Sequence, residues 1–229
     1  LITAVCAVFL PRLSYYAGTQ EKKKFKELAS VSAGLIVSIA IPCAFGMIVL
    51  ANQAIILFSG REFLDAVSAT RILAVNLFFS AIDGYLGWQI LVPNRKDKVL
   101  LGATIVGAIT DFVLNLFLIP AAGINGAAAA TLAAEGMVFI ICLTSSVKYM
   151  EIRKFTIHLV KVVLASVPVF AVGKLVMTVT SSVLLSSVLT VILTVIIYVA
   201  ILIVLKDEFL NQVVCDVKRT LENKEKKGD

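Results

Sequence analysis

Side chains that can bind ions occur in the middle of long apolar stretches of this sequence. Carboxylate, amide and hydroxyl oxygens are the ligands that hard cations prefer, and a carboxyl group can also exchange a proton. Ionisable groups at membrane depth are costly and normally face protein or a water-filled cavity. The pattern therefore predicts one cavity or ion-coupling site lined by Asp83, Asp111, Asn115, Thr131 and Glu135.

Asp111 and Asn115 are four residues apart, so they share one face of a helix. Together with Thr131 they predict a Na⁺ site, while the acids also allow coupling to protons. The alternative is that these polar groups only hydrogen-bond to neighbouring helices and hold a bundle together.

The stretches that carry these residues belong to a strongly apolar chain. Its 229 residues are 59% hydrophobic and 16% charged, against about 25% charged in soluble domains. A soluble protein of this size has too little interior to bury so many apolar side chains. The composition predicts an all-α integral membrane protein and excludes secreted, fibrous and disordered classes.

Apolar runs of about 20 residues, the length that a helix needs to cross the hydrocarbon core, mark the spans. They predict six complete transmembrane helices after the end of a seventh, whose beginning we expect to be missing because the chain opens within an apolar run. The partial span is 1–17, and the complete spans lie near 28–52, 68–92, 99–119, 122–147, 157–179 and 182–205.

Lys and Arg residues alternate between the two sides of these spans. The first, third and fifth loops with their flanks and the tail hold 18 of them, whereas the opposite side holds 3, namely Arg61, Arg71 and Lys174. Because basic residues near span ends stay in the cytoplasm, the C-terminus is predicted to be cytoplasmic. The same placement accounts for the net charge of +6 without a nucleic-acid partner, since no basic patch is interleaved with aromatic residues.

Other single residues carry weaker signals. Arg71 either reaches the interface or contacts an anionic headgroup of a substrate. Trp88 and Tyr85 are expected to pack or to anchor at the interface, and His158, beside basic residues, is expected to be solvated. There is no Ser/His/Asp set, glycine-rich phosphate loop or HExxH motif. We therefore expect a protein that is not an enzyme and has no cofactor beyond a coupled Na⁺ or H⁺.

A series of short strings, in order and spacing, resembles bacterial polysaccharide flippases. These are the polysaccharide transporters, of O-antigen type, within the multidrug/oligosaccharidyl-lipid/polysaccharide exporter superfamily, related to lipid II flippases and more distantly to drug extruders. The strings are LPRLS at 10–14, the lysine-rich run 18–27 before a span with Pro42, FSGREF at 58–63, PNRKDK at 93–98, the run from Asp111 to Pro120, and GINGAAAAT at 123–131.

This resemblance implies a MATE-like pair of helical lobes that work by alternating access. The cargo would be an undecaprenyl-diphosphate-linked oligosaccharide, flipped outward across the bacterial plasma membrane for surface polysaccharide synthesis. The chain would be the C-terminal lobe of a 14-helix member, and its partners would be the lipid-linked substrate, membrane lipid and a missing N-terminal lobe. In placement, Asp111, Asn115 and Thr131 look similar to the cation site of related flippases.

The resemblance also divides the chain. Residues 1–17 are the end of a truncated helix, 18–148 the helices of flippase type, 149–205 two further transmembrane helices, and 206–229 a cytoplasmic tail. Three other functions stay open. They are a cation-coupled extruder of cationic drugs with Asp83, Asp111 and Glu135 as ligands, a lipid II flippase, and a scaffold of cell-wall synthesis that transports nothing.

Overall fold

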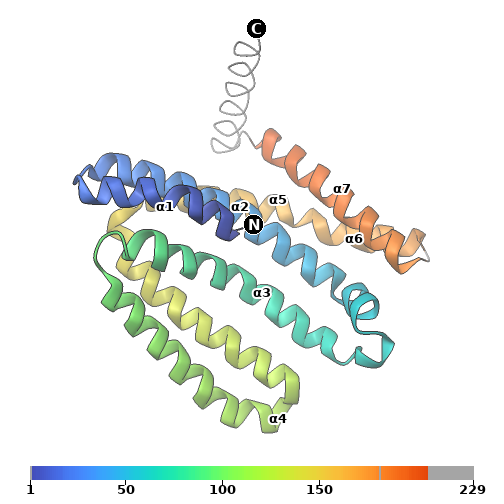
Figure 1. Ribbon diagram of the computed structural model, residues 1–229. Coiled ribbons are helices and arrows are strands. Elements are labelled where there is room, and N and C mark those ends of the chain that lie inside the picture. The colour runs from blue at the N-terminus through green and yellow to red at the C-terminus, as the bar shows by residue number, and fades with distance from the viewer. Residues whose placement is uncertain (1, 181, 206–229) are drawn as a thin grey trace.

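The computed structural model describes residues 2–180 and 182–205, and it is helical throughout that part of the chain, with no strand (Figure 1). The predicted all-α fold is therefore confirmed. The predicted tail, 206–229, lies outside the described residues. The helices are α1 (Ile2–Gly18), α2 (Lys22–Phe58), η1 (Arg61–Phe63), α3 (Ala66–Tyr85), the π-helical η2 (Leu86–Leu91), α4 (Asp97–Ser146), η3 (Val147–Tyr149), α5 (Ile152–Ser166), α6 (Pro168–Val179) and α7 (Val183–Val204).

Five helical stretches in the described part are long and apolar enough to cross a membrane, and one of them makes two passes. The stretch 97–149 has 53 residues, which would measure about 80 Å as a straight helix. Instead α4 reverses at Gly123, where φ is 54° and ψ is −130°, and its two arms lie side by side (Figure 1). The arms match the predicted spans 99–119 and 122–147.

Glycines let the two arms of α4 approach closely. A Cβ atom on Gly126 would lie 1.9 Å from the carbonyl oxygen of Leu118, and one on Gly107 would lie 2.5 Å from Cγ2 of Val138. Small residues at helix contacts are how transmembrane helices pack without a hydrophobic driving force. The hairpin is thus fixed at its turn and again near its middle.

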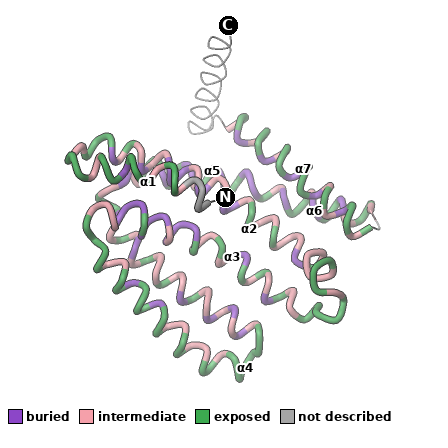
Figure 2. The backbone as a smooth tube through the Cα atoms, in the orientation of Figure 1, coloured by how far each residue is buried: buried purple, intermediate pink, exposed green. Residues whose placement is uncertain are grey.

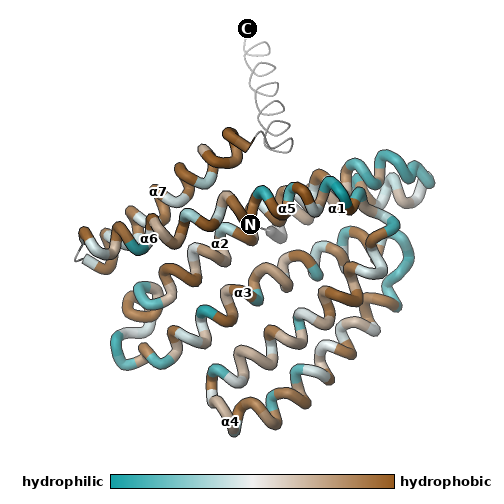
Figure 3. The backbone as a smooth tube through the Cα atoms, turned by 180° about the vertical axis from the view of Figure 1, so that it is seen from behind, coloured by the Kyte–Doolittle hydropathy of each residue, from teal (hydrophilic) through white to brown (hydrophobic). Residues whose placement is uncertain are grey.

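Helix α2 is the centre of the bundle. It packs against α1, α3, α5, α6 and α7, and buried residues concentrate on it and its neighbours, whereas both arms of α4 are mostly exposed or half-buried (Figure 2). The exposed faces are apolar along the middle of the helices, and the polar residues gather near the turns (Figure 3). Helices with this distribution satisfy their backbone internally and present apolar side chains to lipid.

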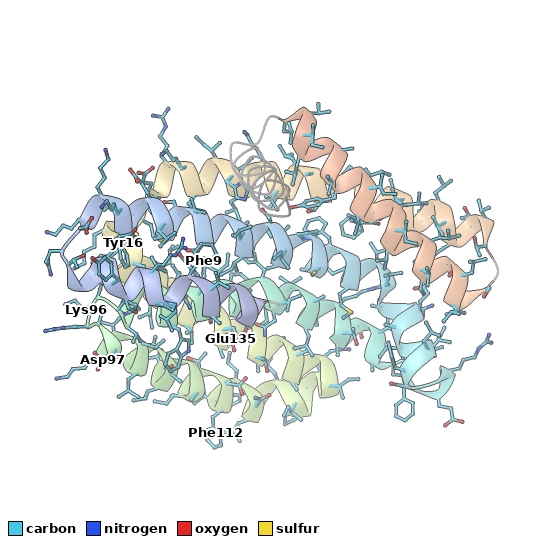
Figure 4. The ribbon with its side chains drawn as sticks, turned by 45° about the horizontal axis from the view of Figure 1, so that its top comes forward. Phe9, Tyr16, Lys96, Asp97, Phe112 and Glu135 are labelled. Atoms are coloured by element: carbon cyan, nitrogen blue, oxygen red, sulfur yellow. The ribbon has the colours of Figure 1, made fainter. Side chains whose placement is uncertain are left out.

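The loops predicted to be cytoplasmic meet at one end of the molecule. Tyr16 beside the first loop and Lys96 in the third lie at the same end (Figure 4). The rings of Phe25 and Tyr149 have centroids 6.3 Å apart, which brings the fifth loop to the start of α2. The alternation of charge in the sequence therefore corresponds to a grouping in space.

One expectation about the region after residue 148 is wrong. His158, expected to be solvated, is only 8% exposed; its Nε2 lies 3.0 Å from Oγ of Ser38 and 3.1 Å from the carbonyl oxygen of Gly34. The predicted span 157–179 falls within one apolar helical stretch, Ile152–Val179, in which Val167 separates α5 from α6. Pro168 explains the division because it has no N–H to continue the helical ladder.

Tyr85 fixes the end of α3 to α2, and its hydroxyl group gives a first prediction. The side chain is buried, and the hydroxyl donates to the carbonyl oxygen of Ala29 at 2.6 Å and lies 2.8 Å from Oγ of Ser32. We expect Tyr85→Phe to cost about 0.5–1.5 kcal/mol of stability, because it removes a buried hydrogen bond while the Ala29 carbonyl keeps its amide partner within α2. Thermal unfolding in detergent measures this, and Tyr15→Phe, at a 62% exposed tyrosine, should change nothing. Equal shifts in both variants would contradict the prediction.

Candidate functional site

A cavity of about 410 Å³ opens between α3, η2 and the two arms of α4. Four of the five predicted cavity residues line it, which are Asp83, Asp111, Thr131 and Glu135. Small residues such as Gly84, Gly107 and Ala134 form other parts of its wall, so the helices leave room for it. In Figure 4, Glu135 points into the interior, whereas Phe112, on the other side of α4, points away from the bundle.

The turn at Gly123 brings Asp111 and Thr131 together. Oγ1 of Thr131 donates to Oδ1 of Asp111 at 3.3 Å, across the two arms of α4. Asn115, one turn from Asp111, is absent from the cavity wall, but its Oδ1 atom is buried without a hydrogen-bond partner in the described residues. Buried polar atoms normally have partners, so this buried oxygen, one helical turn from Asp111, is of the kind that a cation could use as a ligand.

Asp83 and Glu135 form a second group of carboxylate oxygens in the same cavity. Asp83 is 6% exposed, and both side chains line the cavity wall, one from α3 and one from the second arm of α4. Two carboxyl groups that line one cavity repel each other when both are ionised, so a cation or a proton between them would be stabilised. The cavity therefore holds two kinds of oxygen site, a Thr–Asp pair with a free amide oxygen nearby and a carboxyl pair.

The residues fit a hard monovalent cation better than a transition metal. No group of three or more His, Cys, Asp or Glu side chains within the described ranges could hold a metal ion. Oxygen atoms of Asp111, Asn115 and Thr131 are of the type that Na⁺ accepts. Any cation held here would be coordinated by amide, hydroxyl and carboxylate oxygens, and the coupling role of these residues remains a prediction.

Trp88 is a large aromatic cavity residue that the sequence did not indicate. It was expected to pack or to anchor at the interface, yet it is 64% exposed and lines the cavity together with Asp83. Residues five apart in an ideal α-helix point about 140° away from each other. The π-helical turn Leu86–Leu91 changes that spacing, and π-turns are frequent at functional sites. Periodicity at 3.6 residues gives no signal for such a turn.

Arg71 lies apart from this cavity. Its side chain is exposed on α3 and is absent from the cavity wall. Of the predicted residues, the structure thus brings together the acids and Thr131, leaves Asn115 beside them, and separates Arg71.

The match to known proteins decides the family. The model of the family "Lipid II flippase MurJ" matches residues 1–199. The chain belongs to this flippase family. Membership among flippases was expected, whereas the polysaccharide-transporter branch is not the one whose model matches. A family member of this kind is a multi-pass membrane protein.

Two relatives describe how far the likeness extends. The "Probable low-salt glycan biosynthesis flippase Agl15" of Haloferax volcanii is 27% identical over 128 residues, which are 56% of this chain and 27% of that protein. A solved structure, "Lipid II flippase MurJ, inward closed conformation", superposes with a TM-score of 0.76 over 90% of this chain and 43% of that chain, at 18% identity. That likeness shows the fold, and the chain spans less than half the length of either protein.

Proposed function

We propose that this chain is part of an ion-coupled flippase that moves an undecaprenyl-diphosphate-linked oligosaccharide outward across the plasma membrane, for the synthesis of surface polysaccharide. The match of the family model over residues 1–199 carries the flippase part of this proposal. The Agl15 relative, whose name includes glycan biosynthesis, supports a lipid-linked glycan as the cargo class.

The cavity supplies a place for ion coupling. Asp111 and Thr131 with the free oxygen of Asn115 would bind Na⁺, and the carboxyl pair of Asp83 and Glu135 would exchange a proton. The first site lies between the two arms of α4, and the second lies between α3 and α4. Binding of an ion would therefore change the charge between these helices. Such a differential interaction is what an ion needs to shift one conformation toward another.

The proposed orientation in the membrane follows from the order of the spans. A second helical lobe would close the path on the other side, since transporters of this kind move one repeat against another. The basic end that holds Lys96 would face the cytoplasm, and the C-terminus would lie on the same side. Arg71 would lie at the outer side, where a contact with an anionic headgroup of the cargo is part of this proposal.

Lipid II is the second candidate for the cargo, and the name of the matching family favours it. The two cargoes share a polyprenyl diphosphate and differ in the attached glycan. Recognition of the diphosphate alone therefore does not distinguish them.

Two cell assays separate these cargoes with the full-length protein. Deletion of the gene in its own cells should abolish surface polysaccharide while the cells stay viable. In a second strain, depleted of its own lipid II flippase, expression of the full-length protein should leave growth unrestored. Restored growth would instead assign lipid II as cargo. No effect in either assay would favour a scaffold without transport and would overturn the proposal.

A further inference from the structure

Helix α2 contains a carbonyl group that its own backbone cannot satisfy. Pro42 lies inside the helix and has no N–H. In an α-helix that N–H would donate to the carbonyl four residues earlier, which here belongs to Ser38. A free carbonyl within a bundle is costly, so another donor is expected to reach it.

Tyr198 of α7 is that donor. Its hydroxyl donates to the carbonyl oxygen of Ser38 at 2.9 Å, and its side chain is buried. The bond therefore replaces the one that Pro42 removes, and it joins α7 to α2 at the proline. Next to it, the Nε2 atom of His158 lies 3.1 Å from the carbonyl oxygen of Gly34. Because a carbonyl only accepts, this ring nitrogen carries the hydrogen.

The neighbouring helix is also interrupted where it contacts this part of α2. Before the prolines, His158 of α5 contacts Ser38 of α2 at 3.0 Å. After them, the rings of Phe170 and Phe45 have centroids 5.3 Å apart. Pro42 in α2 and the division of α5 from α6 at Val167 both fall between these two contacts. Both interruptions therefore fall within the same stretch of contact between α2 and the α5–α6 pair.

The two halves of α2 are also tied to different partners. The first half contacts the end of α3 through Ser32 and Tyr85, and the loop before α5 through the Ser30 hydroxyl and the Glu151 amide. The second half is packed against α6, where a Cβ on Gly173 would lie 2.2 Å from Cγ1 of Val49. The polar ties that these bonds supply to the first half of α2 thus differ from the close packing against α6 in its second half.

We propose that α2 and the α5–α6 pair form a double hinge at Pro42 and Pro168, and that the hydrogen bond from Tyr198 to the Ser38 carbonyl is its releasable latch. Kinks at proline are a common place for helices to bend. The hinge is argued from contacts alone, whereas its use in alternating access depends on the proposed function. The latch ties α7 to α2 beside Pro42, and its release lets the two halves of α2 change their angle.

A double-mutant cycle on the full-length protein tests the latch. Tyr198→Phe should lower the apparent Tm by about 2–4 °C, because it leaves the Ser38 carbonyl unpaired. In the Pro42→Ala background, residue 42 regains its N–H and can pair the Ser38 carbonyl. There, Tyr198→Phe should lower Tm by less than about half of the decrease that it causes in the parent protein. Tyr85→Phe is the matched control, because its acceptor Ala29 has an ordinary amide partner at Ala33. Its effect should be equal in both backgrounds.

An equal decrease in Tm on Tyr198→Phe with and without Pro42 would overturn the latch.

The hinge has a separate readout that does not require transport. Spin labels at Lys23 and Leu57, both exposed near the ends of α2, report its bend in a variant without native cysteines. With undecaprenyl diphosphate as probe, we expect two distance populations whose ratio changes in Tyr198→Phe, and one population in Pro42→Ala. A single unchanged population in all three proteins would overturn the hinge, whatever the cargo.

Discussion

Replacement of Gly126 by alanine should abolish the folded protein. The new Cβ atom would lie 1.9 Å from the carbonyl oxygen of Leu118 and 2.4 Å from its carbon, both of which are backbone atoms of the opposite arm of α4. Backbone cannot move aside as a flexible side chain can, so the hairpin must open. Overpacking in a well-packed core costs about 1–3 kcal/mol of stability and occasionally more. We expect a clash with backbone atoms to cost as much as the largest of these values or more. We expect little or no monodisperse protein after membrane extraction.

Gly136→Ala is the control for this prediction. Gly136 lies in the same arm, and a Cβ atom on it would meet no heavy atom within 4 Å. Alanine is the better helix former by about 1 kcal/mol, so this variant should be extracted as well as the parent. Normal yield and thermal stability of Gly126→Ala would show that the turn at Gly123 tolerates a wider separation of the arms.

Replacement of Asp111 by asparagine should remove coupling while it leaves the fold intact. Asparagine keeps the size and still accepts the hydrogen bond from Thr131, which is 3.3 Å long in this structure, but it removes the negative charge that a cation requires. We expect the stimulation of flipping by a Na⁺ gradient to fall by about tenfold, within the usual 5–150-fold range of coupling between sites. Flipping of a fluorescent lipid-linked glycan by the full-length protein in vesicles measures this.

The matched control is Asp97→Asn, at an exposed acid in the first turn of the same helix. Its flipping rate and its dependence on Na⁺ should equal those of the parent protein. Thr131→Val should change in the same direction as Asp111→Asn, because it removes one neutral oxygen ligand. If Asp111→Asn kept full Na⁺ stimulation with an unchanged Tm, Asp111 would have no role in coupling and the cation site would have to be placed elsewhere.

Hydropathy and charge alone determined the class of this protein. Local runs of apolar residues fix the length of each span, and basic loops fix their alternation, because both depend on the contact of each segment with lipid or water. The arms of α4 therefore agree with the predicted spans, although one continuous helical stretch contains both. The acids Asp83, Asp111 and Glu135 could be placed near mid-depth on three successive spans for the same reason.

The tertiary structure decided which of these residues meet. Thr131 reaches Asp111 because Gly123 takes a conformation that reverses α4, and Trp88 joins the cavity because a π-turn changes the helical spacing. His158 is buried, against the expectation, because a backbone carbonyl and a serine hydroxyl of α2 are in reach of its ring. These contacts depend on the relative placement of segments far apart in the chain, and hydropathy, which measures each segment separately, does not contain that information.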